Sequence, residues 1–193
     1  MAEFLIREVT EQEFFERIWR FRVAARLAAE LMPEDARHLG YWIDSHDEHA
    51  VQFAAFDRGG VLLAVARFCV HSRWEDLPHA SLYEELRPAP PVASFNRLTV
   101  CPSARGYGIG RALDRVRLDR ALALGVAAVV VPVTEDLVAI RAPSLSQLGF
   151  MRSDSLRLEP ECGPGRWGYF AFTVSTWAGG DGSGSNVSSR CGA

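Results

Sequence analysis

The chain has 193 residues, of which 48% are hydrophobic and 23% charged, with a formal net charge of -3 at pH 7. These values are typical of one globular domain, and they exclude a disordered chain and a strongly basic protein drawn to nucleic acid or anionic lipid. All 21 basic residues are arginine, which excludes mechanisms that need a lysine side chain, such as a P-loop or a pyridoxal Schiff base. Widely spaced cysteines, no secretory leader and no long apolar run predict a cytoplasmic protein without a membrane partner.

The first half of the chain predicts a strand, a helix and a β-hairpin. A strand at residues 4–9 is followed by Thr10 and Glu13, which have the spacing of a helix capping box. Apolar residues then recur at steps of three and four, which indicates a helix that ends near Leu31. A short helical or irregular piece follows at residues 34–45. Two strands then form a hairpin, at residues 49–56 and 61–70, around an Asp-Arg-Gly-Gly turn at residues 57–60.

The second half predicts a long loop and a βαβ unit. Residues 72–91 contain four prolines and read as a surface loop around a short helix at 82–86. A right-handed βαβ unit with a parallel strand pair follows. It consists of a strand at residues 93–100, a Gly-rich turn at 105–110, a helix at 111–124 and an apolar strand at 126–133. A helix and two strands follow at 137–148, 150–158 and 168–174. We expect one domain over residues 1–177 and a flexible Gly/Ser-rich tail over residues 178–193.

The segment from Arg97 to Leu113 carries the chemical signal, and it reads Arg-Leu-Thr-Val-Cys-Pro-Ser-Ala-Arg-Gly-Tyr-Gly-Ile-Gly-Arg-Ala-Leu. Glycines at alternate positions let backbone N–H groups converge on an anion, at the positive end of the following helix dipole. Arg105 and Arg111 can add charge-assisted contacts to a pyrophosphate. A dinucleotide fingerprint would need glycine in place of Arg111 or Leu113, so the Rossmann reading fails.

The motif Arg-x-x-Gly-x-Gly, between a strand ending in Val-x-Pro and a helix, resembles the acyl-coenzyme A loop of the GNAT N-acyltransferase superfamily. Leu148-Gly149-Phe150 stands where that family commonly has a Gly-Phe pair. The resemblance covers the chain from Phe4 to about Val174. It implies an α/β fold of GNAT type, with a mixed, mostly antiparallel sheet of six to seven strands, a central splayed parallel pair and helices on both faces.

The resemblance also implies an activity. It is transfer of an acyl group, most simply acetyl, from acetyl-CoA or another acyl-CoA to a primary amine of a small molecule or peptide, by direct attack in a ternary complex. The acyl-CoA is a co-substrate, and no metal is expected. The donor contacts implied are at Leu98, Thr99, Val100, Arg105, Gly106, Tyr107, Gly108, Ile109, Gly110 and Arg111.

The catalytic acid and base of many family members have no counterpart here. Ser94 stands where they place Glu, and Leu145 where they place Tyr. Three candidates for handling the amine proton follow. Ser94 can order a water, and His71 has an unperturbed pKa near 6.5. Glu84, or its neighbour Glu85, lies in the long loop.

Two alternatives stay open at this point. Asp47, Glu48 and the Ala66-Arg67 pair resemble the acyl-homoserine-lactone synthase branch and related long-chain N-acyltransferases, which implies a longer acyl-CoA or an acyl carrier protein as donor. The arginines of the 111–124 helix would then face that acidic partner. A catalytically silent acyl-CoA-binding regulatory module is the other alternative, because the usual Glu and Tyr are missing. The sequence leaves a monomer and a homodimer equally open.

Overall fold

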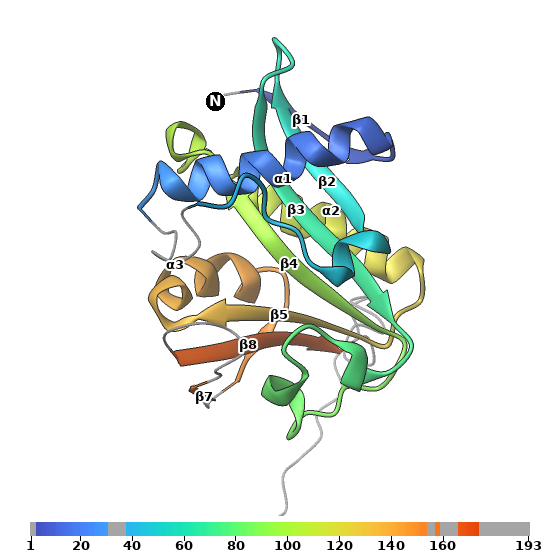
Figure 1. The fold of residues 1–193 in the computed structure, drawn as a ribbon. Helices are drawn as coiled ribbons and strands as arrows, with labels where there is room; N and C mark the ends of the chain where they lie inside the picture. The colour runs from blue at the N-terminus through green and yellow to red at the C-terminus, as the bar shows by residue number, and fades with distance from the viewer. Residues whose placement is uncertain (1–2, 31–37, 154–156, 159–165, 174–193) are drawn as a thin grey trace, which may run out of the picture.

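The computed structural model describes residues 3–30, 38–153, 157–158 and 166–173, and a mixed sheet forms its centre (Figure 1). The sheet has eight strands in the order β1-β2-β3-β4-β5-β8-β6, with β7 beside β8. Every neighbouring pair is antiparallel except β4 and β5, which are parallel. The strands are β1 (Phe4–Val9), β2 (Val51–Asp57), β3 (Leu62–His71), β4 (Val92–Val100), β5 (Ala128–Thr134), β6 (Met151–Arg152), β7 (Arg157–Leu158) and β8 (Arg166–Thr173).

Helices cover both faces of this sheet. Helix α1 (Gln12–Leu27) places Ile18 against Val65 and its neighbours on one face. Helices α2 (Ile109–Ala123) and α3 (Glu135–Ser146) place Leu113 and Leu145 in the larger core on the other face, together with Phe95. Short 3₁₀ helices occupy the connections, at η2 (Ser45–Glu48), η3 (Trp74–Asp76), η4 (Ala80–Tyr83) and η5 (Pro102–Ala104).

The predicted fold class is confirmed, with corrections of detail. Two-residue strands β6 and β7 raise the count from the expected six or seven to eight. The predicted capping box between Thr10 and Glu13 is wrong, because helix α1 begins after Glu11, which makes no side-chain cap. The Glu11 carboxylate instead accepts hydrogen bonds from Arg7 and from the backbone N–H of Thr10. The same helix ends at Leu27, before the expected end near residue 31.

Several sequence predictions fall outside the described residues. They include part of the irregular piece expected at 34–45, part of the strand expected at 150–158, and the 178–193 tail with its domain boundary. Within the part of the chain that the structure describes, none of the helices combines the length and apolar character needed to cross a membrane.

The parallel strands β4 and β5 separate along their length. They pair only from Val92 to Ser94 of β4 and from Ala128 to Val130 of β5. Beyond those residues β4 keeps β3 as its partner and β5 keeps β8. The expected splayed pair is therefore present, and it leaves an edge of β4 without a strand partner.

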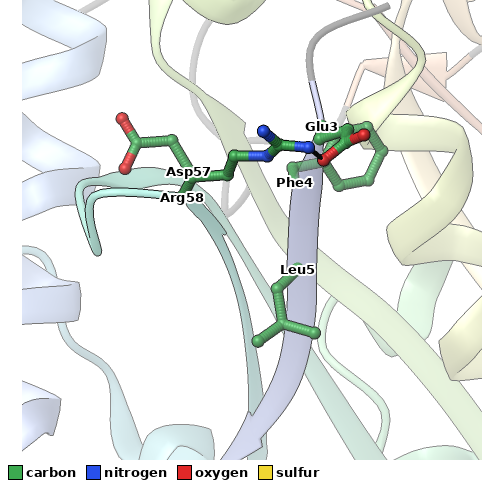
Figure 2. A pocket seen from close by; sticks show the side chains of 5 residues that line it. All are labelled: Glu3, Phe4, Leu5, Asp57 and Arg58. Carbon is green, nitrogen blue, oxygen red and sulfur yellow. Dashed lines mark hydrogen bonds and ion pairs between the residues drawn. The ribbon is translucent and has the colours of Figure 1, made fainter.

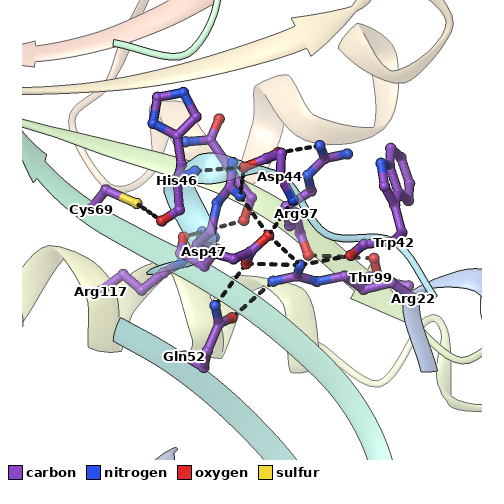
Figure 3. A network of polar contacts seen from close by, with 12 residues as sticks. Arg22, Trp42, Asp44, His46, Asp47, Gln52, Cys69, Arg97, Thr99 and Arg117 are labelled. Atoms are coloured by element: carbon purple, nitrogen blue, oxygen red, sulfur yellow. Dashed lines mark hydrogen bonds and ion pairs between the residues drawn. The ribbon is translucent and has the colours of Figure 1, made fainter. Parts of the chain in front are cut away.

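A buried ionic network joins α1 and η2 to the sheet (Figure 3). Asp47, in η2, accepts hydrogen bonds from Arg22 of α1 at 2.9 Å and from Arg67 of β3 at 3.0 Å. Gln52 of β2 donates to the same carboxylate and accepts from Arg22. All four side chains are buried, so each polar group depends on its protein partners because water does not reach it.

Replacing Asp47 with Asn should destabilise the fold strongly. Two buried guanidinium groups would lose their shared anion, and a broken buried pair typically costs about 3–5 kcal/mol. Denaturant unfolding measures this loss directly. Glu16→Gln is the matched control, since Glu16 pairs with Arg20 in solvent on α1 and should matter by about 1 kcal/mol or less. Equal effects of the two substitutions would contradict the role assigned to Asp47.

Candidate functional site

The opening between β4 and β5 is shaped by a β-bulge. The register between β3 and β4 shifts between Val65 and Arg67, so Arg97 and Leu98 both lie opposite Ala66. Arg97 has φ of 54°, a left-handed conformation that a side chain other than glycine rarely adopts. A bulge of this kind bends a strand and redirects its backbone groups, here at the point where β5 has departed.

Backbone amides of β4 face this opening. The N–H of Cys101 donates to the carbonyl of Leu63 at 2.9 Å, on the β3 side. Consecutive N–H groups of an extended strand point to opposite edges, so those of Val100 and Leu98 point to the other side. They lie beyond the last residue that pairs with β5. They are therefore placed to donate to a ligand that enters the opening.

The Gly-rich loop follows β4 directly and leads into α2. Gly106 and Gly108 have φ of 81° and 79°, and a Cβ built on either meets no atom within 4 Å. Gly108 is the N-cap of α2, so the loop presents an open backbone surface at the positive end of the helix dipole. A Cβ at Gly110 would lie 3.5 Å from Leu98, so that glycine lies beside the bulged strand. These observations fit a bound pyrophosphate.

The side chains predicted to contact the donor differ in where they point. Arg105, Tyr107 and Arg111 are exposed, and the Arg105 guanidinium reaches the carbonyl of Val100 at 3.4 Å. Ile109 is buried in the core, so any contact it makes with a donor comes from its main chain.

Ser94, His71 and Asn96 form a buried hydrogen-bonded group where β4 and β5 part. Nδ2 of Asn96 donates to Oγ of Ser94 at 2.9 Å, and Oγ lies 2.9 Å from Nε2 of His71. The backbone of Asp76 also acts on the imidazole and favours its protonated form. We assign the proton of the neutral ring to the nitrogen that faces Asp76, so that Nε2 accepts from the Ser94 hydroxyl.

The expectation of an ordinary histidine pKa at residue 71 is wrong. Burial, followed by the nearby His46, lowers the pKa of His71 to about 4. The two imidazole rings are 5.9 Å apart. At neutral pH the His71 ring is therefore uncharged, a hydrogen-bond acceptor and only a weak base.

Glu84, the third candidate, follows the short helix η4. Its side chain is exposed at the end of η4, and its carbonyl accepts from Arg87 at 3.1 Å. Leu145, where family members place a tyrosine, is buried in the larger core. The catalytic role of Glu84 stays a prediction.

The sequence analysis did not predict a group of charged side chains beside the bulge, part of which Figure 3 shows. We call this group the charged wall, and it consists of Arg22, Arg26, Asp44, Asp47, Arg67 and Arg97. Asp44, just before η2, accepts hydrogen bonds from both Arg67 and Arg97. Burial raises the pKa of Asp44, but the hydrogen bonds from the two arginines lower it further, well below the usual range. The guanidinium carbons of Arg26 and Arg97 lie 4.1 and 4.0 Å from the Trp42 ring. The resemblance of Asp47 and Arg67 to the acyl-homoserine-lactone synthase branch indicated this region, but it did not predict how the charges are paired.

A separate surface hollow lies at the sheet edge, between β1 and the β2–β3 turn (Figure 2). It is lined by Glu3, Phe4, Leu5, Asp57 and Arg58, and Glu3 forms an ion pair with Arg58. It is lined from β1 and the end of β2, and β3 lies between these strands and β4 in the sheet order. Across the described ranges, no group of three or more His, Cys, Asp or Glu side chains is arranged to hold a metal ion.

Comparison with known proteins connects this geometry to one fold. No family model matches the chain, and no curated protein matches its sequence. FeeM, an N-acyl amino acid synthase from uncultured soil microbes, is 16% identical over 92% of this chain and 94% of its own, with a TM-score of 0.67. YncA from Salmonella typhimurium, solved with its cofactor acetyl-CoA, is 16% identical over 93% and 99%, with a TM-score of 0.60.

A third structure is the ribosomal-protein-S18-alanine N-acetyltransferase from Escherichia coli. It is 18% identical over 94% of this chain and 99% of its own, with a TM-score of 0.55. The chain therefore has the fold of the GNAT N-acyltransferases, as the Gly-rich motif predicted. At these identities the likeness carries the fold, and function is argued from the site.

The buried histidines should make stability depend on pH. The pKa of His71 is about 4 in the folded state against 6.5 unfolded, and burial lowers those of His46 and His79 too. Between these values the unfolded chain binds more protons, so the free energy of unfolding falls as pH drops from 6.5 toward 4. We expect a lower Tm at pH 5 than at pH 7.5, measured by calorimetry.

His71→Gln should reduce this pH dependence of Tm, and His49→Gln, at an exposed histidine, should leave it unchanged. A Tm that is flat from pH 7.5 to pH 5 would show that the three histidines are not protected from protonation.

Proposed function

We propose that this protein is an N-acyltransferase that moves an acyl group from coenzyme A to a primary amine by direct attack in a ternary complex. The observation that carries the proposal is the opening after Ser94, where free edge amides of β4, the Gly-rich loop and the Ser94–His71 group meet. A thioester donor supplies an activated carbonyl and a thiolate leaving group. The acceptor supplies a neutral amine.

The donor side of the site is built mainly from backbone. Leu98, Thr99 and Val100 would run beside the pantetheine, and the N–H of Leu98 or Val100 would donate to the thioester carbonyl as charge develops on its oxygen. The loop from Arg105 to Arg111 would hold the pyrophosphate through its N–H groups and exposed guanidinium groups.

The acceptor side carries the groups that handle a proton. Ser94 Oγ accepts from Asn96 and lies against the neutral ring of His71, so its position and orientation are fixed. Such a hydroxyl can order a water or hydrogen bond to the amine directly. His71 keeps that hydroxyl oriented as an acceptor, and its low pKa makes it a poor store for the amine proton.

A longer acyl donor is the second candidate, for two reasons. FeeM, which has a TM-score of 0.67 to this chain, is named an N-acyl amino acid synthase. The exposed surface of helix α2 carries Arg111, Arg115 and Arg120 against the single exposed carboxylate of Asp119, an excess of positive charge that suits an acidic carrier protein. Mass spectrometry of products from acetyl-CoA, longer acyl-CoA thioesters and acyl carrier protein thioesters would separate these donors. Binding of acyl-CoA without release of thiol for any amine would favour a silent regulatory module instead.

Gly108→Glu should abolish acyl-CoA binding while the fold persists. The new carboxylate would occupy the anion site at the start of α2 and repel the pyrophosphate. Calorimetric titration with coenzyme A measures the affinity, and circular dichroism confirms folding.

The matched control for this variant is Gly60→Glu. Gly60 has φ of 78°, almost that of Gly108, and lies in the β2–β3 turn, so the control introduces the same backbone strain away from the loop. It should bind coenzyme A as the wild type does. Unchanged affinity in a folded Gly108→Glu variant would refute the assignment of the loop.

Ser94→Ala should lower kcat by roughly tenfold or more if Ser94 positions the water or amine during proton transfer. The exposed neighbour Ser72 supplies the control, and Ser72→Ala should leave kcat unchanged. His71→Gln should reduce kcat less, because glutamine can still accept from the serine hydroxyl.

The pH profile tests the state of His71 separately. With a pKa of about 4, His71 should produce no acid limb in kcat near pH 6.5. An acid limb near pH 6.5 that disappears in His71→Gln would show instead that His71 titrates during turnover as a general base. Normal kcat in both variants would transfer the proton role to Glu84 or to solvent.

A further inference from the structure

Arg26 lies close to Arg97 of the β4 bulge, because the guanidinium groups of both stack on the Trp42 ring. It belongs to the last turn of α1, and its guanidinium stacks on Trp42, 4.1 Å from the ring centroid. The backbone of Trp42 is itself fixed, because its backbone N–H donates to the carbonyl of Trp19 and its backbone carbonyl accepts from Arg22. The Arg26 side chain is thus held against a rigid aromatic ring, which limits the conformations open to it.

Charges from both arms of the opening act on Arg26. Burial and then the like charge of Arg97 on β4 lower the pKa of Arg26 to about 10, and the opposite charge of Asp136 acts against this shift. Asp136 lies in the first turn of α3, immediately after β5. Arg26 is therefore placed where α1, β4 and the end of β5 come together, on the acceptor side of the site.

Arg26 differs from the other arginines of this wall in its partners. Arg22 and Arg67 bind Asp47, and Arg97 binds Asp44. Among the described residues, none has a carboxylate within ion-pair distance of Arg26. A partly buried guanidinium beside a second cation is unfavourable until an anion pairs with it.

We propose that the acceptor carries a carboxylate close to its amine, as an amino acid does, and that Arg26 binds this carboxylate. The planar fork of a guanidinium matches a carboxylate with two parallel hydrogen bonds, which fixes the direction of the ligand as well as its position. With its carboxylate held by Arg26, the acceptor directs its amine toward Ser94 and the edge amides of β4. This inference rests on the proposed acyl transfer and adds the class of acceptor.

A phosphate of the donor is the other anion that can pair with a guanidinium at this position. The Gly-rich loop that suits such a phosphate belongs to α2, which packs on the opposite face of the sheet from α1. Arg26 on α1 therefore favours a ligand from the acceptor. The two sources predict different kinetics, since one changes the KM of the acceptor and the other the KM of acyl-CoA.

The test compares matched acceptors. Each amino acid is assayed beside its amide and its decarboxylated amine, at saturating acyl-CoA, with the full chain. We expect kcat/KM of the wild type to favour the carboxylate by about tenfold or more, the scale of a charged hydrogen bond. Arg26→Gln should remove most of this preference by raising the KM of the amino acid.

Two further variants make the comparison specific. Arg26→Lys keeps the charge without the fork, so it should retain part of the preference and covers the case in which the glutamine variant folds poorly. Arg20→Gln removes an exposed arginine from the same helix and should leave the preference intact.

The possible failures are distinguishable. Equal turnover of carboxylates and amides by the wild type, or an unchanged preference in both Arg26 variants, would overturn the carboxylate site and leave acyl transfer standing. A rise in the KM of acyl-CoA in Arg26→Gln would assign Arg26 to the donor and overturn the inference as well. Absence of acyl-CoA binding and of turnover with every amine would overturn the proposed function itself.

Discussion

The separation of the two parallel strands after Ser94 is the constraint on which the rest of the site depends. It exists because β4 bends at a bulge, and a bulge disturbs the ladder that satisfies backbone groups. The buried guanidinium of Arg117 braces that region, since it donates to the carbonyls of Arg67 at 2.9 Å and Asn96 at 3.4 Å. Arg117 is paired with Asp114 on the same helix, so α2 holds the bent strand and also carries the Gly-rich loop at its start. Opening and loop therefore keep a fixed relation.

Ion pairs on the other face connect fold and recognition. Asp47 joins Arg22 of α1 to Arg67 of β3, and Arg67 in turn shares Asp44 with Arg97 at the bulge. A guanidinium has five donors in a planar fork, so one side chain can satisfy several acceptors that a lysine ammonium would meet less well. The same contacts that attach α1 to the sheet thus set the charge beside the bulge, where we propose that the acceptor binds.

How much of the fold and of the site could be predicted depends on how far apart the interacting residues lie in the sequence. The Gly-rich loop and the hairpin around Gly60 are local, so their residues predicted their structure correctly. The pairing of Asp47 with Arg22 and Arg67 joins three separate elements, and no periodicity reveals it. The pKa of His71 was mispredicted for a related reason, because burial depends on packing that the neighbouring sequence does not contain. Arg26 was missed because the sequence does not show that three elements meet around it.

The burial that lowers the pKa of His71 also bears on how an amine reacts here. An ammonium group entering the same surroundings loses solvation as the imidazolium does, so its neutral form is favoured. Arg67 acts on this region in the same direction through like-charge repulsion. An amine that reaches Ser94 is therefore prepared to lose its proton to solvent without a strongly basic side chain. In the proposed acyl transfer, this would explain how serine can occupy a position where many GNAT acyltransferases place glutamate, since the surroundings favour the neutral amine and the serine hydroxyl orients it.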